Sequence, residues 1–211
     1  MAHRPDMPRD TLAPVAESRS LALARLLSVV FNPMVAGIAS YFAVGYYALD
    51  SGENGLSWAG VAVLLQVLPP LLFYLVQLRR GAFSDPDVSV RHERNQMYLF
   101  ATFSVLISIG VLAALGVPRP LLALAVGTLL IGVVCGIVNL FWKISMHGAG
   151  MGSLATVTLL YTGTPGLALW ALAAAVGWAR VRTRNHTPLQ VLGGLALSAV
   201  MMAVSFAFIA Q

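Results

Sequence analysis

The sequence contains few charged residues, and this scarcity excludes an ordinary soluble domain. Among 211 residues there are 8 acidic residues and 13 lysines and arginines, so charged side chains amount to 10%. Soluble domains average about 25%. Hydrophobic residues make up 58% of the chain. We therefore expect an integral membrane protein, in which the net charge of +5 does not indicate a nucleic-acid partner.

Cysteine is almost absent, and long polar stretches are missing as well. Cys135 is the only cysteine, so the chain forms no intrachain disulfide. Short connections join the apolar runs and leave no segment for a soluble domain. We expect a polar, disordered or surface-lying tail over residues 1–20 and a single transmembrane helical domain over residues 21–211. The first apolar run is too long for the hydrophobic region of a signal peptide.

Seven apolar runs predict an all-α integral membrane protein. The expected fold is a bundle of six to seven transmembrane helices with the active site at one membrane face. The runs lie at about 21–49, 57–78, 96–115, 121–142, 150–161, 166–178 and 188–210. Two of them, 150–161 and 166–178, are shorter than the roughly 20 residues that a membrane helix needs, which leaves six or seven crossings open. Asn32-Pro33 is expected to kink the first run.

Basic residues are distributed unevenly between the two sides that seven crossings would define. The connections 79–95, 143–148 and 179–187 fall on the same side as the N-terminus. That side carries twelve of the thirteen basic residues, and Arg119 alone lies on the other. By the positive-inside rule the basic side is cytoplasmic. We expect a multi-pass protein of the cell's inner membrane whose active-site side faces the cytoplasm.

A short basic segment lies before the last apolar run. It carries three arginines, including Arg180, and ends at His186. Thr187 suits a helix N-cap and Pro188 suits the first turn, so His186 would lie where unpaired N–H groups and the helix dipole favour a phosphate. Gln190 lies four residues after His186, on the same helix face.

The spacing of Arg180, His186 and Gln190 resembles the third signature, SRxxxxxHxxxD, of the type 2 phosphatidic acid phosphatase superfamily. Ala179 stands in place of the serine and Gln190 in place of the aspartate. The string His-Thr-x-x-Gln-Val is similar to the one that dolichyl diphosphatases, a polyprenyl branch of this superfamily, carry here. The resemblance implies a phosphatase without metal or cofactor, in which His186 is the nucleophile and Gln190 orients it.

A second cluster, 143–147, resembles the PSGH signature of the same family. It keeps the serine and the histidine at their spacing, as Ser145 and His147. The resemblance implies that His147 is the general acid and that Ser145 contacts the phosphate. Lys143 is either a further phosphate contact or an anchor at the membrane surface.

The third cluster lies in the connection 79–95, where the family carries KxxxxxxRP. No lysine is present here, and Asn95 stands where the proline would be. The resemblance carries over only the role of a cationic phosphate donor, to Arg91 and Arg94. Asp85 and Asp87 either hold the guanidinium groups in place or bind a magnesium ion that bridges a diphosphate.

The resemblance to this family implies a membrane lipid phosphatase that acts through a phosphohistidine. Polyprenyl phosphates and diphosphates are the favoured substrates, followed by lipids of the phosphatidic acid type. A catalytically weak relative that binds or translocates lipid phosphates is the main alternative. A serine protease that pairs Ser145 with His186 lacks flanking glycines around its serine, and a magnesium-dependent prenyl transferase lacks a second aspartate-rich segment. The oligomeric state is left open.

Overall fold

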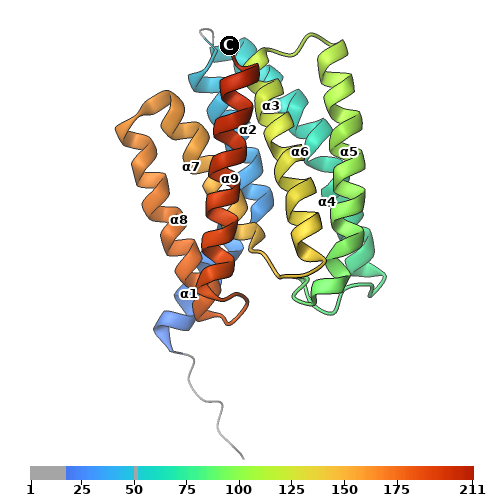
Figure 1. The fold of residues 1–211 in the computed structure, drawn as a ribbon, viewed down its shortest axis with the longest axis vertical. Helices are drawn as coiled ribbons and strands as arrows, with labels where there is room; N and C mark the ends of the chain where they lie inside the picture. The colour runs from blue at the N-terminus through green and yellow to red at the C-terminus, as the bar shows by residue number, and fades with distance from the viewer. Residues whose placement is uncertain (1–17, 50–51) are drawn as a thin grey trace, which may run out of the picture.

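The computed structural model describes residues 18–49 and 52–211, and within them it contains helices and no strands. Of the tail predicted over residues 1–20, residues 1–17 lie outside the described residues, and Arg19 and Ser20 belong to α1. Figure 1 shows the bundle. Its elements are α1 (Arg19–Val30), α2 (Pro33–Tyr47), α3 (Gly52–Gln66), α4 (Leu68–Arg79), the 3-10 turn η1 (Arg91–Glu93), α5 (Arg94–Ala114), α6 (Arg119–Asn139), α7 (Met146–Thr162), α8 (Thr164–Arg182) and α9 (Pro188–Ile209).

The break between α1 and α2 confirms the kink predicted at Asn32-Pro33. The two helices meet at 52°. Asn32 caps α2, because its Oδ1 accepts the backbone N–H groups of Met34 and Val35, each at 3.0 Å. Pro33 follows in the first turn, where a backbone N–H would have no carbonyl partner within the helix, so the lack of an N–H in proline costs no hydrogen bond. Local side-chain chemistry therefore ends one helix and begins the next.

Several helices are long and apolar enough to cross a membrane. Four stretches of the described chain meet that description, and the bent pair of α1 and α2 makes five if it counts as one span. The four stretches are Asn54–Arg79, Arg91–Ala114, Arg119–Asn139 and Pro188–Ile209. The two shorter apolar runs of the sequence form α7 and α8, which are not among them. The expected six or seven crossings are therefore not confirmed.

Helix α7 lies inside the bundle and packs against α2, α8 and α9. Its contact with α9 is close, because a Cβ atom on Gly152 would lie 2.2 Å from the Oγ of Ser198. A Cβ on Gly194 would lie 2.4 Å from the carbonyl oxygen of Ser145. Glycine at these two positions lets the backbones of α7 and α9 approach. This approach places the first turn of α7, which carries His147, beside the first turn of α9, which carries Gln190.

The connections that carry the candidate residues lie at one end of the bundle. In Figure 1 the segments 80–93, 140–145 and 183–187 are at the lower end, near α1, and the C-terminus is at the opposite end. Contacts between these segments join them directly. The backbone N–H of Ser145 donates to the carbonyl of Gln190 at 3.2 Å, and Arg180 pairs with Asp87. The clustering at one end that the sequence predicted is confirmed.

Candidate functional site

Arg180 is the central cation of the site. It lies in the last turn of α8, is 1% exposed, and its Nη2 donates to the Oδ2 of Asp87 at 3.1 Å. Its Nε has no hydrogen-bond partner among the described residues. Asp87 itself is 42% exposed at its side chain. A buried guanidinium that keeps one N–H unpaired beside a half-exposed carboxylate has the donors that bind an oxyanion.

Asp85 and Asp87 serve different purposes in the loop before η1. Asp85 accepts the N–H groups of Asp87 at 2.8 Å and of Ser89 at 3.0 Å, and the hydroxyl of Ser89 at 3.2 Å. These bonds close a turn on the aspartate's own segment. Asp87 alone contacts an arginine. Of the two roles that the sequence left open, pairing with a guanidinium is the one that Asp87 has in this structure.

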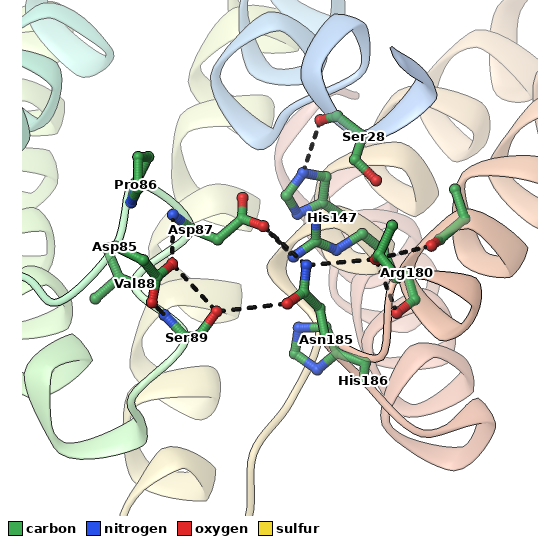
Figure 2. A network of polar contacts seen from close by, with 12 residues as sticks. Ser28, Asp85, Pro86, Asp87, Val88, Ser89, His147, Arg180, Asn185 and His186 are labelled. Carbon is green, nitrogen blue, oxygen red and sulfur yellow. Dashed lines mark hydrogen bonds and ion pairs between the residues drawn. The ribbon is translucent and has the colours of Figure 1, made fainter. Parts of the chain in front are cut away.

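Asn185 is a site residue that the sequence analysis missed. Its Nδ2 donates to the Oδ2 of Asp87 at 2.8 Å, so that one carboxylate oxygen accepts from both Asn185 and Arg180. The Oδ1 of Asn185 accepts the hydroxyl of Ser89 at 3.5 Å. Figure 2 shows this network, which joins the loop before η1 to the segment between α8 and α9. The position of Asn185 directly before His186 was the only sequence signal.

His186 is held in one tautomer by Gln190. The Oε1 of Gln190 lies 3.2 Å from the Nδ1 of His186 and accepts the backbone N–H of Thr187 at 3.1 Å. Because the Thr187 N–H can only donate, the atom facing it must be the amide oxygen, and the Nδ1 facing the same oxygen must carry a proton. Nε2 is then the unprotonated nitrogen. The predicted N-cap at Thr187 is confirmed, with Gln190 completing a capping box.

The surroundings keep the imidazole of His186 neutral. The side chain is 6% exposed, and burial is the main reason why its pKa is lowered from 6.5 to about 3. Arg94, Lys143 and Arg180 lower the pKa further because their charges repel the imidazolium. The pKa of Lys143 is also lowered, first by burial and then by Arg94 and Arg180. Three cations from three different segments are thus close enough to His186 to repel its charged form.

Arg94 and Arg91 take different positions although they are three residues apart. Arg94 is buried, and it donates from Nε to the carbonyl of Val88 at 2.7 Å and from Nη1 to that of Ile144 at 3.2 Å. Arg91 is exposed, and its Nη1 donates to the carbonyl of Asn139 at 2.8 Å and to that of Leu140. Arg91 therefore caps the C-terminus of α6. In the structure Arg94 lies in the site, and Arg91 lies at the C-terminal end of α6.

Ser145 and His147 lie at the start of α7. Ser145 is fully buried as the N-cap, and its Oγ accepts the N–H of Gly148 at 3.2 Å. His147 is 8% exposed, and its Nε2 lies 3.0 Å from the carbonyl oxygen of Ser28 in α1. Since a carbonyl only accepts, Nε2 carries the proton and Nδ1 is unprotonated in the neutral ring. In the view of Figure 2 the Arg180 guanidinium lies between the rings of His147 and His186.

Comparison with known proteins adds no relative. Compared with known protein families, curated proteins and solved structures, the chain matches none of them.

Within residues 18–49 and 52–211 there is no group of three or more histidine, cysteine, aspartate or glutamate side chains that could hold a metal ion. The charged and polar groups of the site are its cations, Asp87, the two histidines and the amides of Asn185 and Gln190.

Proposed function

We propose that the protein is a membrane lipid phosphatase that hydrolyses the phosphomonoester or diphosphate of a lipid through a phosphohistidine on His186. One observation carries the proposal. A neutral imidazole, with Nδ1–H directed to Gln190 and Nε2 unprotonated, is close enough to Arg94, Lys143 and Arg180 for their charges to lower its pKa. A nucleophilic nitrogen beside three positive charges suits attack on a phosphorus that carries negatively charged oxygens.

The proposed reaction has two steps. Nε2 of His186 forms a bond to phosphorus in line with the departing oxygen, and the bond from phosphorus to that oxygen breaks. His147, protonated on Nδ1 for this step while its Nε2–H stays directed to Ser28, gives the Nδ1 proton to the departing alcohol or phosphate. Water then attacks the phosphohistidine, its proton goes to His147, and inorganic phosphate leaves. Arg180, Arg94 and Lys143 stabilise the negative charge on the three equatorial oxygens in both steps.

Asp87 occupies the position in which we place the phosphate. Its Oδ2 accepts from Arg180 and Asn185, and both groups are donors that a phosphate oxygen would also use. A carboxylate and a phosphate carry charge of the same sign, so both do not share these donors. The substrate phosphate therefore displaces Asp87, which is exposed enough to move away from Arg180.

The membrane placement belongs to the same proposal. We place the basic end of the bundle in the cytoplasm, at the inner membrane of the cell, because the order of apolar runs in the sequence assigns twelve of the thirteen basic residues to that side. Helices α7 and α8 would complete six or seven crossings as a pair in which the neighbouring helices bury most of α7. Favoured substrates are polyprenyl phosphates and diphosphates, followed by phosphatidic acid-type lipids, since the string that includes His186 and Gln190 is similar to that of the polyprenyl branch.

A second candidate function is binding or translocation of a lipid phosphate with little catalysis. Two observations favour it. Gln190 is neutral, so it orients the ring of His186 but offers no charge to an imidazolium. The proton of His147 is directed to the carbonyl of Ser28, within the protein. Under this alternative the same cations bind the phosphate and no bond to phosphorus breaks.

Phosphate release separates the two functions. The purified protein in detergent is given polyprenyl monophosphate, polyprenyl diphosphate, phosphatidic acid or phosphatidylglycerol phosphate, with EDTA present, beside the His186→Ala variant. The proposal expects release that EDTA does not abolish and that the variant lacks. Folded protein that releases no phosphate from any of the four lipids while still binding them would establish the alternative.

A further inference from the structure

A cavity of about 230 Å³ lies inside the bundle and is separate from the basic site. Its walls come from α2, α4, α5, α6 and α7, together with Gln66 of α3 and Met202 of α9. No charged residue is among the described residues that line it, and neither is His147 or His186. A charged ligand would lose its hydration here without gaining a partner of opposite charge. Any ligand of this cavity is therefore neutral.

Three side chains that line the cavity have buried polar groups without a partner. Gln66, the last residue of α3, is 4% exposed, and neither Nε2 nor Oε1 of its amide has a hydrogen-bond partner among the described residues. Tyr41 is 2% exposed, and its hydroxyl is unpaired within the same part of the chain, as is the hydroxyl of Tyr98. Most buried polar groups in proteins are hydrogen-bonded. Several unpaired groups on one cavity therefore indicate a ligand that carries hydrogen-bonding atoms.

The cavity opens sideways between α2 and α4. Gly37 of α2 and Leu71 of α4 line it, and both are partly exposed. The helix pairs that pack closely in the described part of the chain do not include α2 and α4. Val35 and Leu72, close in sequence to these lining residues, are apolar and exposed, and both helices belong to stretches apolar enough to cross a membrane. We therefore expect a ligand to enter from the bilayer, which requires that it dissolve in lipid.

The cavity has room for one substituted ring. An apolar cavity of roughly 150 Å³ binds benzene, and a volume of about 230 Å³ leaves space for several further atoms. Gln66 and Tyr41 belong to different helices, so a ligand that pairs with both needs two polar atoms. A quinone ring is neutral and flat, dissolves in a bilayer, and carries two carbonyl oxygens. It therefore meets the requirements of charge, entry, size and hydrogen bonding.

We propose that this cavity binds the ring of a membrane quinone. One carbonyl oxygen accepts an N–H of the Gln66 amide, and the other accepts the hydroxyl of Tyr41. In the reduced ligand, a quinol, a ring hydroxyl also donates to the Oε1 of Gln66. Apolar lining residues, including Val105 and Leu124, pack against the ring. The site uses neither His186 nor the cations near it, so it does not depend on the phosphatase proposal.

Two ligands with the same ring test whether the cavity recognises oxygen atoms. Duroquinone is tetramethylbenzoquinone, and durene is the tetramethylbenzene that lacks both carbonyl oxygens. Binding to the full-length protein in detergent is measured as the rise in Tm, the midpoint of thermal unfolding. Saturating duroquinone should raise Tm by about 5 °C, and durene by less than half as much. Equal rises would overturn the proposal, and no rise with either ligand would mean that only ordered water occupies the cavity.

Gln66→Leu and Tyr41→Phe remove the polar groups and keep side chains of similar size. Without ligand, Gln66→Leu should unfold at or above the wild-type Tm, because an apolar group replaces an unpaired amide. In both variants the rise caused by duroquinone should fall toward that caused by durene. Tyr46→Phe is the matched control, since Tyr46 lies in α2 but is exposed and outside the cavity lining. An undiminished rise in Gln66→Leu, or in Tyr41→Phe if Gln66→Leu does not fold, would refute the site.

The basic site provides the last comparison. Duroquinone should raise Tm equally in the wild-type protein and in His186→Ala, and inorganic phosphate should not reduce that rise, because His186 does not line the cavity. A rise that is lost in His186→Ala would place the ligand at the basic site and overturn the proposal. Failure of the phosphatase proposal would show as absent phosphate release and would leave these Tm differences unchanged.

Discussion

The Nδ1 of His186 lies 3.2 Å from the Oε1 of Gln190, and the same oxygen accepts the backbone N–H of Thr187. One side chain therefore caps α9 and fixes the tautomer of the proposed nucleophile. In the family that the motif resembles, an aspartate stands at this position. An amide can orient the imidazole as an aspartate does, but it does not offset the positive charge that develops when Nε2 attacks phosphorus.

Gln190→Glu adds a charge while keeping the length of the side chain. The carboxylate should still accept from Nδ1 and should stabilise the charged ring, so we expect kcat for phosphate release to rise about tenfold. Gln190→Leu removes both the capping bond and the bond to His186, and kcat should fall by at least tenfold. Steady-state kinetics with one lipid phosphate compares them. A kcat for Gln190→Glu equal to that of the wild-type protein would show that the charge of the side chain is irrelevant, and a fall in kcat would contradict the expected stabilisation of the charged ring.

The lowered pKa of His186 makes stability depend on pH. Its folded-state pKa is about 3, against 6.5 for an unperturbed histidine, so the unfolded state binds the proton more tightly. The stability contributed by the neutral ring is complete above pH 6.5 and is lost as the pH falls toward 3. At pH 5 the loss should be about 2 kcal/mol.

Unfolding by denaturant in detergent at pH 7.5 and pH 5 checks this expectation, with His186→Asn as the reference. Other groups, including His147, titrate in both proteins and cancel in the difference. The wild-type protein should lose about 2 kcal/mol more than the variant between these two pH values. Equal losses would mean that His186 is not buried in a neutral form.

Asp87 competes with phosphate in this account. Asp87→Asn keeps a hydrogen-bond acceptor for Arg180 and removes the charge. Inorganic phosphate should then bind about fivefold more tightly, the effect of about 1 kcal/mol for one partly exposed charge pair. Binding measured by calorimetry decides the point. Weaker binding of phosphate to Asp87→Asn would instead make Asp87 a residue that positions Arg180 for its ligand.

Substitutions of Arg91 and Arg94 should have different effects, one on the free energy of unfolding and the other on catalytic activity. Arg94→Gln removes one of three cations around His186, so kcat/KM should fall by at least tenfold. Arg91→Gln removes a cap from α6, so the free energy of unfolding should fall by about 1–2 kcal/mol while kcat/KM stays within twofold. The two variants are matched in chemistry and three residues apart. Loss of activity in Arg91→Gln without loss of stability would contradict the assignment of Arg91 to the end of α6.

Local chemistry explains which features the sequence could predict. Pro33 after Asn32 and Pro188 after Thr187 determine where two helices begin, because a capping side chain and a proline act within a few residues. The gathering of polar connections at one end followed from the alternation of apolar runs. These predictions need no knowledge of which side chains meet across the bundle.

Contacts between distant segments explain what the sequence could not predict. Asn185 joins Asp87 across 98 positions, and no local pattern marks such a pair. Arg91 and Arg94 are the same residue type on adjacent turns, so only the fold distinguishes a helix cap from a site cation. Hydropathy also failed to settle the number of crossings, since the apolar runs of α7 and α8 are short and much of α7 is buried by protein.

Covalent labelling of His186 tests the central claim most directly. The wild-type protein is mixed with a polyprenyl phosphate in EDTA, quenched within milliseconds to seconds, digested and examined by mass spectrometry. The proposal predicts a phosphoryl group on the peptide that contains His186, located on that histidine, appearing and decaying as phosphate is released. Phosphate release without any phosphoryl group on His186, or with the group on another residue, would contradict it.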